Sequence, residues 1–159
     1  MILANKIEKI NVEEDNQYYT SIDGVLFNKS ETEIIDYPNY TGADSYAVPQ
    51  SVTSIGEYSF GGDIPLLKTI IIPDTVTSIS KNAFRNCTNL TSINIPNGIT
   101  IIEDGVFLGC TSLRTIVIPE GVTSIGKNAF ENCSSLISIS LPSTLESIGE
   151  YAFNKCESL

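Results

Sequence analysis

The sequence predicts a β-rich solenoid of α/β type, in which each coil consists of short strands and a short helical turn. Three observations lead to this prediction. The four cysteines, Cys87, Cys110, Cys133 and Cys156, are each separated by 23 residues. Proline recurs at the same interval, at Pro73, Pro96, Pro119 and Pro142. A strand-like apolar segment precedes each of these prolines. A fixed period of this length is the signature of stacked repeats, each of which buries its apolar side against its neighbours.

The first element of each coil is predicted to be a strand that a proline ends. It covers residues 67–72, 90–95, 113–118 and 136–141. Each segment ends in period-two alternation, which is typical of a half-buried strand. The proline lacks the N–H that would continue a ladder. We expect the strands of successive coils to pair in register, about 4.8 Å apart.

Two further elements complete each coil. One is a short strand at 52–55, 76–79, 99–102, 122–125 and 145–148, whose outer residues are predicted to face inward. The other carries Phe60, Phe84, Phe107, Phe130 and Phe153. A Cys follows each of the last four Phe residues by three positions, a spacing that places both side chains on one face of a helical or 3₁₀ turn. We therefore predict a short helical turn here.

The first third of the chain departs from the repeat. Residues 7–12 look like one more strand, but 37 residues separate Val12 from Pro49, against 24 between Ile72 and Pro96. The extra length holds the apolar segments 21–27 and 33–37 around a polar stretch, which predicts a β-hairpin. We interpret residues 1–159 as a single domain, with an atypical first repeat (1–48, hairpin 21–37) and regular repeats (49–159), the last one truncated.

The C-terminal end is expected to be uncapped, because Leu159 stands where another strand would start. Such an end exposes apolar core and a strand edge. Either more protein follows, which we favour, or the end pairs with another copy, which predicts oligomerisation through it. At the other end, the first six residues hold no apolar segment long enough for a signal peptide.

Several repeat columns together resemble the BspA-like leucine-rich repeats. The motifs are Leu-x-x-Ile-x-Ile-Pro, Val-Thr-Ser-Ile-Gly and Asn-Ala-Phe-x-Asn-Cys-x-x-Leu, and the resemblance covers residues 49–159. The column that holds Asn or Cys in other leucine-rich repeats is occupied by Thr75, Gly98, Gly121 and Thr144. The resemblance implies a right-handed stack of short parallel strands. It also implies an extracellular or cell-surface location and a role in adhesion to host or matrix proteins.

Charge and composition exclude some partners. The formal net charge is −10, and the chain contains no histidine. Binding to nucleic acid is not expected, because that requires clustered Lys and Arg. An anionic membrane surface is disfavoured for the same reason. The apolar runs are too short for a transmembrane segment.

The cysteine column has four interpretations: metal ligands, disulfide partners, a nucleophile or core. Zinc sites need paired ligands at short spacing or histidine partners, and a nucleophile needs a base. Neither pattern is present. Stacked cysteines rarely reach disulfide geometry. We interpret Cys87, Cys110, Cys133 and Cys156 as a buried structural ladder, and we expect no cofactor and no metal site.

The outward positions of the first strands vary from coil to coil, whereas the core positions barely vary. Apolar side chains there stand beside two cations, which is a pattern typical of a protein-binding surface. The candidate binding residues are Lys68, Ile71, Thr91, Asn94, Arg114, Val117 and Ile137. The alternative is that β-branched residues simply suit an exposed strand. The tyrosines between residues 18 and 46 form a second candidate surface, or pack a lid on the first coil.

The leading hypothesis is a non-enzymatic protein-binding or adhesion segment of a larger cell-surface protein. The alternative is a structural spacer with no ligand of its own. An enzyme is disfavoured because no nucleophile–base motif is present. An ice-binding solenoid that uses Thr77, Thr100 and Thr123 is remote, because Ile101 and Glu146 interrupt the pattern.

Overall fold

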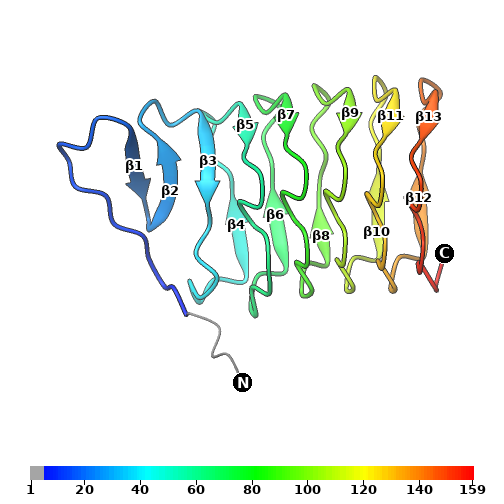
Figure 1. Ribbon diagram of the computed structural model, residues 1–159, viewed down its shortest axis with the longest axis horizontal. Coiled ribbons are helices and arrows are strands. Elements are labelled where there is room, and N and C mark those ends of the chain that lie inside the picture. The colour runs from blue at the N-terminus through cyan, green and yellow to red at the C-terminus, as the bar shows by residue number, and fades with distance from the viewer. Residues whose placement is uncertain (1–5) are drawn as a thin grey trace.

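The protein is a stack of coils along one axis (Figure 1), and the computed structural model describes residues 6–159. The first strands of the coils are β4 (Ser45–Ala47), β6 (Thr69–Ile71), β8 (Ser92–Ile93), β10 (Thr115–Val117) and β12 (Ser138–Ser140). The second strands are β5 (Ser54–Ile55), β7 (Ser78–Ile79), β9 (Ile101–Ile102), β11 (Ser124–Ile125) and β13 (Ser147–Ile148). Before them come β1 (Tyr19–Ile22), β2 (Val25–Asn28) and β3 (Glu33–Asp36). The predicted solenoid is thereby confirmed.

Strands of successive coils pair in parallel and in register. Ile70 of β6 lies opposite Ile93 of β8, and Ile125 of β11 lies opposite Ile148 of β13. The register follows the repeat because each strand buries the same column of side chains. One junction between coils is an exception on both of its strand sides: β7 does not pair with β9, and β8 does not pair with β10.

The predicted helical turns are wrong, because residues 6–159 contain no helix. The segments between second and first strands are successions of tight turns. In residues 82–87 the backbone N–H groups alternate between two kinds of acceptor. Those of Asn82, Phe84 and Asn86 donate to the next coil, while those of Arg85 and Cys87 donate within their own turn. A helix needs every N–H for its own segment, so bonding to the next coil excludes it.

The core is a set of columns that run along the stack. The rings of Phe60, Phe84, Phe107, Phe130 and Phe153 stack with centroids 5.2–5.5 Å apart. The outer residues of the second strands face inward as predicted, since Val52 and Ile55 are fully buried. The cysteines lie beside the Phe column, and three of the four are buried. Each coil alone could not bury these side chains, so stacking provides the stability.

The N-terminal region differs from its prediction in two ways. The expected hairpin is a meander of three strands, in which β2 pairs antiparallel with both β1 and β3. Asp23 and Gly24 both have positive φ and form a two-residue turn inside the segment that was predicted to be one strand. The predicted strand at 7–12 is also wrong. Ile10 N–H donates to Gly24, but no ladder of bonds continues it.

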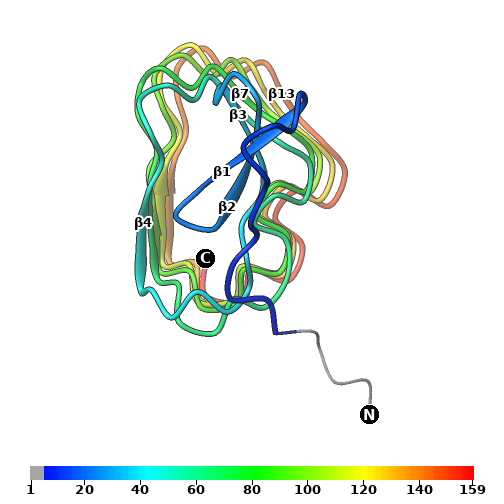
Figure 2. The same ribbon diagram turned by 90° about the vertical axis from the view of Figure 1, so that its left-hand side faces the viewer.

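The meander covers the N-terminal end of the stack. Figure 2 shows β1 and β2 crossing that end, and Val25 and Phe27 of β2 are fully buried there. Tyr37 is buried and stacks on Phe60, with centroids 5.0 Å apart. The apolar face of the first coil is therefore shielded from water. The boundary between an atypical first repeat (1–48) and regular repeats (49–159) stays a prediction.

Candidate protein-binding face

The outward side chains of β4, β6, β8, β10 and β12, with the residues that flank these strands, form one surface, which we call the strand face. Alternation places its residues: Ile70 and Ile116 point into the core, so Ile71 and Val117 must point out. The exposed fractions of Ile71, Val117 and Ile137 are 56%, 67% and 51%. Lys68, Thr91, Asn94 and Arg114 are exposed as well. All seven candidate residues therefore lie on the strand face.

Two cations on the strand face have no acidic partner. The ion pairs found within residues 6–159 are Lys81 with Glu57 and Lys127 with Glu150, and neither involves Lys68 or Arg114. Both cations are thus free to meet carboxylates of another molecule. This is notable in a chain of net charge −10.

Two of the candidate residues have structural partners. Thr91 Oγ1 donates to the Lys68 carbonyl oxygen at 3.1 Å. The Asn94 side chain forms two bonds with one residue of the preceding coil. Its Oδ1 accepts from Ile72 N at 2.8 Å, and its Nδ2 donates to Ile72 O at 2.7 Å. Asn94 is therefore primarily a link between coils.

The strand face is hollowed at two places. One hollow of about 320 Å³ lies between β8 and β10, and Asn94 and Val117 both line it. Another of about 390 Å³ is lined by Arg114 and Ile137, together with Ser112, Ser135 and Ser158. The structure thus brings four candidate residues together in pairs. Lys68, Ile71 and Thr91 line neither hollow.

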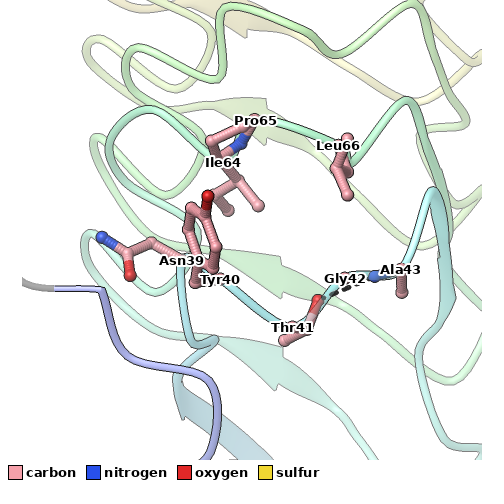
Figure 3. Close-up of a pocket in the computed structure, with 8 residues that line it drawn as sticks. All are labelled: Asn39, Tyr40, Thr41, Gly42, Ala43, Ile64, Pro65 and Leu66. Atoms are coloured by element: carbon pink, nitrogen blue, oxygen red, sulfur yellow. Dashed lines mark hydrogen bonds between the residues drawn. The ribbon is translucent and has the colours of Figure 1, made fainter.

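Sequence reasoning missed a third hollow, which lies where the loops before β4 and β6 meet (Figure 3). Its volume is about 120 Å³, and residues 39–43 and 64–66 line it. Apolar side chains from Ile64, Pro65 and Leu66 face Tyr40 across it. The only sequence signal was the extra residue at Gly61 and Gly62, which makes this coil one residue longer than the others.

The tyrosines of residues 18–46 divide between core and surface. Tyr37 is buried and Tyr46 half-buried, and both rings contact Phe60. Tyr18, Tyr19 and Tyr40 are exposed, and Lys6 Nζ lies 4.6 Å above the Tyr40 ring. Burial raises the pKa of Tyr46 above its ordinary value. Tyr37 and Tyr46 therefore act in packing.

The cysteine column provides no reactive thiol. Each Sγ donates a hydrogen bond to the Phe carbonyl of the preceding coil, for example Cys110 to Phe84 at 3.2 Å. Burial raises the pKa of Cys87 and of Cys133 to about 12, and the pKa of Cys110 also lies well above its usual range. A thiol with so high a pKa is a poor nucleophile and a poor metal ligand.

Residues 6–159 offer neither a metal site nor a membrane-spanning helix. No group of three or more Cys, Asp or Glu side chains there is arranged to hold a metal ion. The same residues include no helix with the length and hydropathy that are needed to cross a bilayer.

The fold and the strand face together define a repeat protein whose coils display variable outward columns on a nearly constant core. The chain matches the BspA type Leucine rich repeat region in six copies over residues 36–159. This protein therefore belongs to the BspA-type leucine-rich repeat family.

Solved structures of bacterial proteins are similar to the chain. A leucine rich cell surface protein from Faecalibacterium prausnitzii is 37% identical with a TM-score of 0.86, and the match covers 91% of this chain and 39% of that one. The pneumococcal vaccine antigen PcpA is 28% identical with a TM-score of 0.84, covering 96% and 38%. A leucine-rich repeat protein of T. pallidum is 28% identical with a TM-score of 0.74, covering 95% and 69%. No curated protein matches the chain. The chain thus spans less than two fifths of the first two proteins.

Proposed function

We propose that the chain is a non-enzymatic protein-binding or adhesion segment of a cell-surface leucine-rich repeat protein, with its ligand bound on the strand face. One observation carries this proposal. The strand face sets exposed apolar side chains, Ile71, Val117 and Ile137, beside the unpaired cations Lys68 and Arg114. Apolar anchors beside charged groups are typical of protein interfaces.

The comparisons support the proposed location. The Faecalibacterium prausnitzii protein is described as a cell surface protein, and PcpA as a vaccine antigen. A chain with this repeat and an extracellular location would meet host or matrix proteins, which are the partners we propose. Oligomerisation through the C-terminal coil is a further proposal, which sedimentation of the purified chain would test.

The chemistry of the side chains supports a non-enzymatic role. The chain has no histidine that could act as a base, and its buried thiols stay protonated. The hollows of the strand face are lined by Ser, Thr, Asn, Arg and aliphatic residues, without a carboxylate pair that could work as acid and base. Recognition is the activity that such a surface supports best.

A variant with four substitutions on the strand face tests the proposal. It combines Lys68→Glu, Arg114→Glu, Ile71→Ser and Val117→Ser. We expect binding to immobilised matrix proteins or whole host cells to fall at least tenfold, since roughly 1.4 kcal/mol of lost contact energy suffices. Surface plasmon resonance and cell-adhesion counts would measure it, and circular dichroism would verify folding.

A matched control carries Lys81→Glu, Lys155→Glu and Ile101→Ser, which change charge and apolarity away from the strand face. Equal loss of binding in both variants would contradict the proposed site. If the unmodified chain captures no protein from serum, matrix or cells, the alternative of a structural spacer is supported instead.

A further inference from the structure

The coils of the stack are not joined equally. Between the segment 76–95 and the segment 99–118, the strands do not pair on either strand side. The strand β7 ends one sheet and β9 begins another, and likewise β8 ends a sheet and β10 begins the next. Figure 1 shows a wider spacing at this junction than between the neighbouring coils. The hollow of about 320 Å³ lies along it. We call this junction the seam.

Backbone donors on the first-strand side locate the seam residue by residue. The N–H groups of Lys68, Thr91 and Ile137 each donate to the carbonyl of the preceding coil. Arg114 occupies the same column, and its N–H has no such bond. Four positions further on, Val48 and Ile118 donate to the next coil, and Ile95 does not.

The second-strand side shows the same interruption. Thr53, Thr77, Thr123 and Glu146 each bond through N–H to the preceding coil, whereas Thr100 of that column does not. The column Gly56, Ser80, Gly126 and Gly149 is bonded likewise, and its member Glu103 is not. Four columns therefore each lose one bond, and all four losses fall on the seam.

One cause of the missing bonds on the first-strand side lies in Asn94. In neighbouring coils the equivalent bonds run from Val48 N to Ile71 O and from Ile118 N to Ser140 O. In the coil of Ile72, the N–H of Ile72 donates to the side-chain Oδ1 of Asn94 and not to a backbone carbonyl of the next coil. The Asn94 Nδ2 also donates to Ile72 O, so Asn94 occupies both backbone polar groups of Ile72. The backbone ladder on this side therefore ends at Asn94, and β8 does not pair with β10.

A second cause lies in Glu103, which stands in a column that is glycine in three of the other four coils. A Cβ on Gly149 would lie 2.5 Å from Lys127 N, and one on Gly126 would lie 2.6 Å from Asp104 N. The glycines thus let the backbones of adjacent coils approach each other. Ser80 carries a Cβ and keeps its N–H bond to Ile55 O at 2.9 Å, but the coil before it is the one that Gly61 and Gly62 lengthen. Glu103 has no lengthened coil before it, and we infer that its Cβ keeps the two backbones apart.

On the third side of the coil, which the turn segments form, hydrogen bonds continue across the seam. Asn82, Phe84 and Asn86 donate through N–H to Asp104, Val106 and Leu108. Cys110 Sγ donates to Phe84 O, and the rings of Phe84 and Phe107 stack 5.5 Å apart. The two parts of the stack are therefore joined along the turn segments and the Phe column, with both strand sides unbonded.

We propose that the seam is a hinge, at which the sub-stacks 6–95 and 99–159 open on their strand sides about the closed column of turns. A bonded ladder on all sides makes a solenoid move as one body. Loss of the ladder on two sides lowers the free energy of local opening at this junction alone. The inference does not depend on the proposed ligand.

Amide hydrogen exchange, measured by NMR on the full chain, tests the seam. We expect the N–H groups of Ile95, Thr100, Glu103 and Arg114 to have protection factors at least about tenfold lower than the other members of their columns. Thr123, Gly126 and Ile137 serve as internal references. Equal protection along each column would overturn the proposal.

Closing the seam provides the matched test. Glu103→Gly removes the Cβ, and Glu103→Ala removes the charge but keeps the Cβ. We expect protection at Thr100 and position 103 to rise about tenfold in Glu103→Gly and to stay unchanged in Glu103→Ala. A rise in both variants would show that charge, and not backbone approach, holds the seam open, and would contradict the mechanism.

Spin-label distances test the hinge motion itself. Labels at Ser78→Cys and Ile101→Cys lie across the seam, and labels at Ser124→Cys and Ser147→Cys lie across a paired junction. A Cys156→Ser background removes the half-buried native thiol. We expect a broader distance distribution across the seam, narrowed by Glu103→Gly. Equal widths in the two pairs would overturn the hinge.

Discussion

At the scale of single residues, the thiol ladder shows how a polar group can be buried in a repeat core. Each Cys is both a small apolar side chain and a weak donor, and its Sγ bonds a Phe carbonyl of the preceding coil. Only the protonated thiol can donate this bond. Burial therefore favours the neutral form and raises the pKa of each thiol. The column stabilises the stack as long as the thiols keep their protons.

This linkage predicts that the protein loses stability in alkaline solution. Above the ordinary thiol pKa of 9.0, the unfolded chain releases protons that folded Cys87 and Cys133 keep until about 12. Stability is therefore fully present below the unfolded pKa and falls as the pH rises through this window, by up to about 1.4 kcal/mol per pH unit for each thiol. Urea unfolding at several pH values measures it.

The control for the alkaline prediction is Cys133→Ala, which removes one of the two thiols on which it rests. We expect this variant to lose about 1–3 kcal/mol near neutral pH, because a buried side chain is truncated, and to show a flatter decline above the thiol pKa. An alkaline slope identical to that of the unmodified chain would show that other groups control it.

At the scale of the element, the turn segments depend on residues that accept a left-handed backbone. Asn82, Asn86, Asn128 and Asn132 have φ between 57° and 61°, and glycine takes the same places in the coil between them as Gly105 and Gly109. In the first and last coils these places are held by Tyr58, Gly62, Tyr151 and Lys155, which also have positive φ. Asn and Gly adopt this region most easily. These positions reverse the chain repeatedly, which explains why the Phe–Cys spacing of a helix is found in a run of turns.

Substitutions at Asn132 separate backbone conformation from side-chain contacts. Asn132 is exposed and has φ of 61°. We expect Asn132→Ala to destabilise the protein by about 1 kcal/mol, because a Cβ without a compensating polar group is strained in this region. Asn132→Gly should stay within about 0.5 kcal/mol of the unmodified chain. Thermal unfolding measures both, and equal losses would contradict a conformational role.

At the scale of the whole molecule, each coil contacts only its neighbours, so stability depends on position along the stack. Phe107 has an aromatic ring on both sides and is fully buried. Phe153 stacks on Phe130 alone and is half-buried. The seam is a second reason for uneven stability, because it interrupts the hydrogen-bond ladder in the middle of the stack.

The position dependence can be measured with one substitution at two places. We expect Phe107→Ala to destabilise the protein by about 3–5 kcal/mol, as is typical of a buried Phe. Phe153→Ala should cost less than half of that, since its ring is partly solvated. Denaturant unfolding gives both values. Equal costs would indicate that the C-terminal coil is packed as tightly as the interior.

The repeat columns predicted most of the architecture. Their period indicated a solenoid, the alternation before Pro119 predicted a first strand, and Val122 with Ile125 indicated the inward side of the second strand. The same alternation placed Ile71 and Val117 on the surface. These inferences succeed because a column that repeats every coil must meet the same environment in every coil.

What the sequence by itself determined, then, is the stack, its register and its outward columns, because these follow from the periodic burial of apolar side chains. Only the tertiary structure decided that the Phe–Cys segments are turns, since their N–H groups bond to the next coil. It alone brought Asn39 to Gly42 against Ile64 to Leu66 at a hollow, and placed the seam at Asn94 and Glu103. Such features depend on how close two coils approach, and a single coil's sequence does not contain that distance.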